Sequence, residues 1–182
     1  MSAATLIQVS DLNEVAEGIF YSRHAIPLVS EGVIDILKSS ARTNSKRRAR
    51  FCAHPSPDAD QHDMLIVSHR DTYVTPHRHL DKSESFTILQ GSALVLLFAE
   101  DGTLEQVEKM GAPDSGYPFF YRMPPRQFHS LSIESELLVF LESAKGPFRP
   151  NAMENAAWAP EPDDAENGRR YINALLNRAA AK

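Results

Sequence analysis

The stretch TPHRHLDKSESFTILQG, residues 75–91, decides which fold and which chemistry the sequence predicts. His77 and His79 are two residues apart, so on a strand both side chains point to one face while Arg78 points to the other. Glu84 begins the next apolar run and shares parity with the apolar side chains of that run. A carboxylate is costly to bury alone, and a cation is its natural partner.

A fourth candidate, His129, lies at the start of another apolar run and shares parity with its apolar side chains. A histidine taken singly is more often a hydrogen-bonded core or surface residue than a metal ligand. The combination of spacing, parity and an apolar-flanked carboxylate favours a ligand set. The sequence therefore predicts one divalent transition metal (Mn, Fe, Co, Ni or Zn) bound by His77, His79, Glu84 and His129.

Short β-rich runs separated by turn residues extend from Phe51 to Ser143, a pattern typical of a sandwich or barrel. The pair Asp101-Gly102 lies between two such runs and is a strong hairpin signal. We therefore expect an all-β, single-domain barrel. The expected strands are 64–69, 73–76, 86–89, 93–98, 104–109, 118–123, 128–133 and 137–141.

Short helical appendages are expected at both ends of the barrel. Ser30 can cap a helix over residues 30–41, whose apolar residues form one stripe. A second helix is expected over residues 164–180, after a loop in which Trp158 anchors the chain to the barrel. The expected parts are an N-terminal arm with one helix (1–45), the barrel (46–145), and a C-terminal loop and helix packed on the barrel (146–182).

Composition excludes several classes of function. Of the 182 residues, 42% are hydrophobic and 24% are charged, which is ordinary for a globular protein. The net charge of -5 gives no electrostatic reason to bind nucleic acid. Cys52 is the only cysteine, so no internal disulfide can form, and no signal peptide or membrane span is recognisable. We expect a soluble, cytoplasmic protein with no nucleic-acid or membrane partner.

The stretch from Asp71 to Gly91 resembles the first motif of the cupin superfamily, which it matches except that Asp71 replaces the first glycine. The second cupin motif is matched at Pro124 and His129 and departs at Arg126 and Ile133. This resemblance implies a double-stranded β-helix, also called a jelly-roll barrel, and a metal centre. Cupins commonly pair, so the resemblance also implies a homodimer.

A narrower resemblance, to the WbuC-type cupin fold metalloproteins, covers most of residues 46–162. Members of this group tend to be linked with surface-polysaccharide or sugar metabolism, which implies a small-molecule ligand. The matching segments are RRARFCAH (47–54), HDMLIV (62–67), PHRHLDKSES (76–85), LLFAEDG (96–102), GPF (146–148) and WAPE (158–161).

Five further residues are candidates for contact with a substrate. Arg50 and His54 lie on one polar face of a possible edge strand, which is either solvated or reaches the barrel mouth to bind an anion. Lys82, between the ligands, has the same two interpretations. Tyr73 and Tyr121 have the parity to face the metal, although such tyrosines are usually core residues. Tyr121 is the candidate catalytic acid or base.

These observations favour a metal-dependent cupin enzyme that acts on a small polar, anionic or sugar-derived substrate. The metal would act as a Lewis acid in an isomerase-, epimerase- or lyase-like reaction. An Fe-dependent oxygenase is an alternative, because a site of histidines and a carboxylate also suits O₂ activation. A non-catalytic, metal-dependent ligand-binding or sensing module is another. The sequence leaves these hypotheses open.

Overall fold

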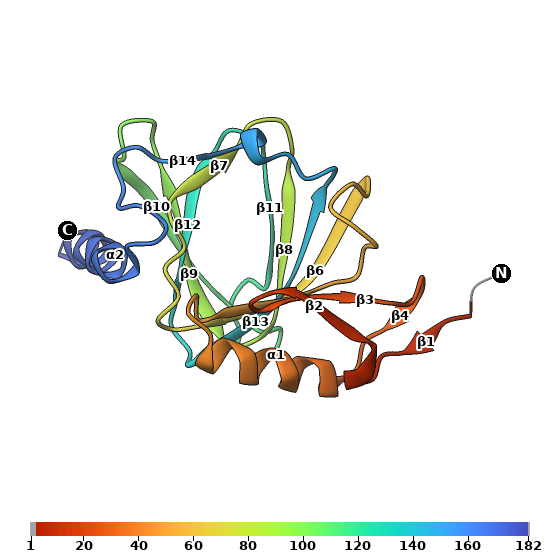
Figure 1. Ribbon diagram of the computed structural model, residues 1–182. Helices are drawn as coiled ribbons and strands as arrows, with labels where there is room; N and C mark the ends of the chain where they lie inside the picture. Colours follow the sequence, from red (N-terminus) through yellow and green to blue (C-terminus); the bar gives the residue numbers. More distant parts are fainter. Residues whose placement is uncertain (1–2, 182) are drawn as a thin grey trace.

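The computed structural model describes residues 3–181 and shows two β-sheets that face each other, with a helix on the outer side of each (Figure 1). One sheet has seven strands. In spatial order they are β11 (Phe120–Met123), β8 (Glu84–Gln90), β13 (Leu137–Lys145), β6 (Gln61–His69), β5 (Arg48–Cys52), β3 (Ile19–Ser22) and β2 (Leu12–Ala16).

The other sheet has five strands, and the remaining elements are short or lie at the ends of the chain. In spatial order its strands are β10 (Leu104–Gly111), β9 (Ser92–Phe98), β12 (Phe128–Ile133), β7 (His77–His79) and β14 (Met153–Asn155). The other elements are the parallel pair β1 (Thr5–Leu6) and β4 (Pro27–Leu28), the helices α1 (Glu31–Thr43) and α2 (Ala165–Ala180), and the 3₁₀ turns η1 (Val9–Asp11) and η2 (Pro150–Ala152).

From β6 to β13 the chain passes back and forth between the two sheets. β6, β8, β11 and β13 belong to the larger sheet, whereas β7, β9, β10 and β12 belong to the smaller one. All pairings among these strands are antiparallel. This alternation is the double-stranded β-helix of the cupin fold, so the expected all-β cupin barrel with helical appendages is confirmed.

Each helix covers the outer face of one sheet because it presents an apolar stripe to it. Val33 and Leu37 of α1 are buried against Phe51 of β5 and the neighbouring strands. On the other side, Ile172 of α2 packs with Phe98 of β9. A third cluster, with Phe86, Leu131 and Phe140 among its members, fills the space between the sheets. None of the helices within residues 3–181 is long and apolar enough to cross a membrane.

The loop after β14 is fixed to the β9–β10 hairpin. The Trp158 indole packs against Phe98 and Phe128, and its Nε1 donates a hydrogen bond to the Glu100 carbonyl at 3.2 Å. Gly102 in the hairpin turn has φ +85°, and a Cβ there would lie 2.7 Å from the indole. The expected hairpin and the expected tryptophan anchor are both confirmed.

Three local expectations are wrong. Residues 73–76 form no strand, and the strand begins at His77 instead. β5 is not an edge strand, because β3 of the N-terminal arm pairs with it in parallel and places it inside the sheet. Ser30 occupies the N-cap position of α1, but its hydroxyl makes no capping hydrogen bond.

Candidate metal centre

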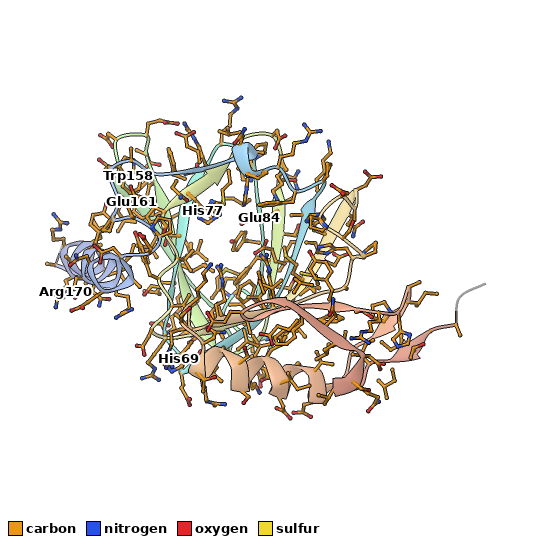
Figure 2. The ribbon with its side chains drawn as sticks, in the orientation of Figure 1. His69, His77, Glu84, Trp158, Glu161 and Arg170 are labelled. Carbon is orange, nitrogen blue, oxygen red and sulfur yellow. The ribbon has the colours of Figure 1, made fainter. Side chains whose placement is uncertain are left out.

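Strand pairing brings the three predicted histidines together. His77 on β7 is directly opposite His129 on β12, and β14 pairs with the other edge of β7 and holds that short strand in the sheet. Glu84 is the first residue of β8 and reaches the histidines from the opposite sheet. Figure 2 shows His77 and Glu84 facing each other across the barrel interior. The four side chains therefore join both sheets.

The three ring nitrogens are close enough to share one ion, and the Glu84 carboxylate contacts two of the rings. One ring nitrogen from each of His77, His79 and His129 lies within 4.8 Å of the others. Glu84 Oε2 is 2.9 Å from His79 Nε2, and Oε1 is 3.0 Å from His129 Nε2. Neighbouring ligand atoms around an octahedral metal with bonds of about 2.1 Å are about 3.0 Å apart. The donor set and its spacing therefore fit a transition metal.

Backbone carbonyls fix which nitrogen two of the three rings offer. His77 Nδ1 donates to the Thr75 carbonyl at 2.8 Å, and His129 Nδ1 donates to the Gln127 carbonyl at 2.9 Å. Both rings thus turn Nε2 toward the centre, as second hydrogen bonds do in metal sites. His129 Nε2 is buried and has no well-aligned hydrogen-bond partner among the described residues, although Glu84 is close. An ion at this position would give that nitrogen a partner.

The four groups influence one another's protonation. Burial and the neighbouring His129 lower the pKa of His77 to about 3, so its ring is neutral at physiological pH. Burial alone would raise the pKa of Glu84, but the adjoining His129 and His79 rings hold it well below its ordinary value. Burial opposes protonation of His129, yet the Glu84 carboxylate raises the pKa of that ring. The centre therefore offers an ionised carboxylate among imidazoles.

Arg78 stabilises the outer face of β7, the strand that carries His77 and His79. Its Nε donates to Glu154 Oε2 at 2.9 Å and its Nη2 to Glu154 Oε1 at 3.2 Å, while Nη1 bonds Glu100. The guanidinium also lies over the Phe128 ring, 4.3 Å from its centroid. This bidentate pairing ties β7 to β14 and to the β9–β10 hairpin. Alternation along β7 thus places the two histidines on the inner face and Arg78 on the outer face, as the sequence predicts.

A cleft of about 210 Å³ opens beside the histidines. It reaches His79, and its rim includes Lys82 as well as Lys145 and Arg149 from the segment that follows the barrel. Three cations at the rim outnumber the two acidic residues of the lining, Asp60 and Asp81. The lining of this cleft therefore carries a net positive charge, and Lys82, for which the sequence leaves both a surface role and contact with an anion open, lies in it.

Tyr121 faces the barrel interior from β11. Its ring stacks on Phe86, with centroids 5.0 Å apart. Burial, then the charges of Glu84 and Glu142, raise the pKa of Tyr121 well above its ordinary value. The phenol therefore stays protonated near the ligands, which suits a hydrogen-bond donor or an acid better than a base.

The expectation that Tyr73 projects toward the metal is wrong. Its ring lies against Gly168 of α2, and its hydroxyl donates to the Pro160 carbonyl at 2.9 Å, outside the smaller sheet. His54 is also unsuited to act as a cation for an anion, because burial and the neighbouring His62 lower its pKa. Its ring stacks on His62 at 4.1 Å between centroids, which gives it a packing role.

The structure brings two further polar residues to the interior that the sequence analysis did not select. Glu142 of β13 lies opposite Phe86, and burial followed by the Glu84 charge raises its pKa to about 7. Arg48 lies beside the predicted Arg50 on the inner face of β5 and influences the same carboxyl. Parity predicts both positions. Glu142 is two residues from the buried Phe140 and shares its face of the strand, and Arg48 shares a face with Arg50 in the same way.

Comparison with known proteins adds little about the reaction. A family model described as a domain of unknown function (DUF6016) matches residues 29–110. No curated protein matches the chain. One similar solved structure is the capsular polysaccharide assembling protein CapF from Staphylococcus aureus, with 13% identity and a TM-score of 0.49 over 62% of this chain and 32% of that one. The chain thus spans about a third of the length of CapF.

Two further solved structures are similar to the chain. One is an uncharacterized conserved protein with a double-stranded beta-helix domain from Klebsiella pneumoniae, with 16% identity and a TM-score of 0.47 over 63% of this chain and 82% of that one. The other is a variant of oxalate decarboxylase OxdC from Bacillus subtilis, with 16% identity and a TM-score of 0.45 over 59% and 27%. Likeness at this level assigns no reaction to the chain.

Proposed function

We propose that the chain is a mononuclear metal-dependent cupin enzyme that acts on a small polar, anionic or sugar-derived substrate. The observation that carries the proposal is the cluster of His77, His79, Glu84 and His129, which two sheets build jointly. Lone histidines on a surface share neither fixed ring orientation nor a common carboxylate. A divalent metal bound here would supply Lewis-acid polarisation of a substrate oxygen.

The surrounding residues of the chain have separate roles in this proposal. Lys82 and the other cations at the rim of the cleft attract an anionic substrate. Tyr121 donates a hydrogen bond from its protonated hydroxyl to the bound substrate. Glu142 stands close enough to Glu84 for their charges to interact and can hold or release a proton inside the barrel. The proposed reactions, isomerisation, epimerisation or elimination, all need a proton moved next to a polarised oxygen.

Elemental analysis of the protein purified without added metal tests the proposal. We expect about one transition-metal ion per chain in the wild type and loss of most of it in His77→Ala, Glu84→Gln and His129→Ala. His24→Gln is the matched control, because His24 lies in the N-terminal arm and pairs with Asp11. Equal metal content in the control and in all three site variants would contradict the proposal.

The same preparation separates the two alternatives. An iron-loaded protein that consumes O₂ with a co-purified small molecule would favour the oxygenase. A protein that binds such a molecule only with metal, and returns it unchanged, would favour the binding module. The structure gives the Fe-dependent oxygenase no separate support, because His129 adds a third histidine to the two histidines and one carboxylate that such oxygenases use.

The proposal also covers the subgroup, location and assembly of the protein. The matching segments in the sequence support a WbuC-type cupin, and the lone Cys52 is compatible with the cytoplasm. A homodimer is supported by Leu89, Phe120 and Leu141, which are exposed on the outer face of the larger sheet. Light scattering should give twice the chain mass for the wild type and a smaller value for Phe120→Glu. A monomeric wild type would contradict the dimer.

A further inference from the structure

A pair of arginines lies on the inner face of β5, apart from the proposed metal ligands. Arg48 and Arg50 share this face with Cys52, which belongs to the cluster between the sheets, whereas Ala49 and Phe51 belong to the cluster under α1. β5 is held between β6 and β3, so this orientation is fixed on both sides. Both guanidinium groups are therefore directed to the interior side of the sheet.

Neither guanidinium has a hydrogen-bonding partner within residues 3–181. No ion pair or hydrogen bond involves the guanidinium group of Arg48 or Arg50 among the described residues, and Arg50 Nε is fully buried without an acceptor. A buried donor without a partner costs about 1–3 kcal/mol. Arg78 shows the ordinary situation in the same barrel, with two glutamates to accept from it. The described residues provide no acceptor for either guanidinium group.

Charge leads to the same conclusion. Within the part of the chain that the structure describes, Glu142 lies close enough to Glu84, Arg48, Arg50 and Lys82 for their charges to influence its carboxyl. With a divalent metal bound to the four ligands, three side-chain cations and the metal are opposed by two carboxylates. Arg48 is also solvent-exposed even though surrounding protein atoms lower its pKa. Water therefore reaches the inner face of β5, and a small solute can follow.

We propose that Arg48 and Arg50 form an anion subsite that binds a carboxylate or phosphate group of the substrate. Two planar guanidinium groups from alternate positions of one strand offer several N–H donors that match the oxygens of an oxyanion. The substrate would then carry an oxyanion at one end and an oxygen for the metal at the other, as in a hydroxy acid or a sugar phosphate. The metal end rests on the proposed function, whereas the anion end rests on the arginine pair alone.

Titration calorimetry with two simple probes, inorganic phosphate and acetate, tests the subsite in the metal-loaded full-length chain. We expect at least one probe to bind the wild type, and to bind Arg50→Gln and Arg48→Gln about tenfold more weakly, the loss of one charge-assisted contact. The preferred probe tells phosphate from carboxylate substrates. Arg170→Gln is the control, because Arg170 is exposed on α2 (Figure 2) and pairs with Glu166.

Metal content and melting temperature are measured on the same samples. We expect unchanged metal content and an equal or higher melting temperature in Arg50→Gln, because the change removes an unpaired buried charge. A melting temperature that falls while probe affinity stays at the wild-type value would show a structural role and overturn the subsite. So would a wild type that binds neither probe. Loss of metal only in the histidine and glutamate variants would leave the proposed function standing in either case.

Discussion

The two sheets of the barrel contribute opposite kinds of chemistry to its interior. The smaller sheet, backed by α2, supplies three imidazoles, and backbone carbonyls fix the orientation of two of them, His77 and His129. The larger sheet, backed by α1, supplies carboxylates and guanidinium groups, and the arginine pair among them lacks partners. The chain itself thus holds the rings of the smaller sheet, whereas we propose that a ligand completes the arginine pair of the larger one. The difference separates a proposed metal end from a proposed anion end.

Metal removal should give the largest effect on stability, because the metal joins the two sheets. At a free metal concentration of 1,000 times Kd, binding to the folded state alone adds about 4 kcal/mol. We expect a clear fall in melting temperature after chelation and recovery on adding metal. His129→Ala should show a much smaller dependence on metal. Equal melting temperatures for the wild type with and without metal would show that a metal does not stabilise the contact between the two sheets.

Glu142→Gln tests the larger sheet through pH. The pKa of Glu142 rises from 4.5 to about 7 in the folded state, so ionising it costs stability progressively across that interval and fully above it. One pKa unit corresponds to about 1.4 kcal/mol, so metal-free Glu142→Gln should gain up to about 3 kcal/mol over the wild type at pH 8 and almost nothing near pH 4.5. Urea unfolding at a series of pH values measures the difference.

Glu105→Gln is the control for this experiment, since Glu105 is exposed on β10. Its difference from the wild type should stay flat with pH. A Glu142→Gln difference that is equally flat would show that the carboxyl is solvated and that the interior face of the larger sheet is not charged as described.

Arg78→Ala tests the clamp on the smaller sheet. Loss of hydrogen bonds between charged groups should cost about 2 kcal/mol of unfolding free energy. It should also weaken metal binding about tenfold, because β7 would be less firmly held. Arg170→Ala removes an exposed ion pair on a helix and should cost no more than about 0.5 kcal/mol of unfolding free energy. Equal metal affinity in Arg78→Ala and the wild type would mean that β7 needs no outer brace.

The two covering helices differ at their first turns, which gives the smallest expected effect. Asp164 caps α2 by accepting from the Asn167 backbone, whereas Ser30 makes no such bond to α1. Asp164→Ala should therefore cost about 1 kcal/mol and Ser30→Ala less than about 0.5 kcal/mol. Chemical denaturation of both variants checks the order. The reverse order would place the firmer cap on α1.

The sequence predicts the barrel and the proposed ligand cluster well because both depend on local spacing. The period of two along β7 separates the histidines from Arg78, and the structure confirms that division. The strand 128–133 is predicted with its observed ends. The expectation for Tyr73 is wrong because residues almost a hundred positions later hold it: its ring packs on Gly168 of α2, and the Pro160 carbonyl in the preceding loop accepts its hydroxyl. No local pattern carries that contact.

The larger sheet was harder to predict because it depends on long-range pairing. β5 reads as an edge strand until β3 of the arm is placed beside it. That placement puts the strand that carries Arg48 and Arg50 inside the sheet. Glu142 lies in a run of apolar residues, and its parity with Phe140 is the signal that could have identified it. Charged residues in apolar strands therefore merit as much attention as histidines.

Anomalous diffraction from crystals of the metal-loaded protein tests the central claim most directly. The account predicts one strong peak at the absorption edge of the bound metal, about 2.0–2.3 Å from a nitrogen each of His77, His79 and His129 and from a Glu84 oxygen. That result would place a single ion between the two sheets. A metal-loaded crystal with no peak at these four residues, or with its only peak elsewhere, would contradict the account.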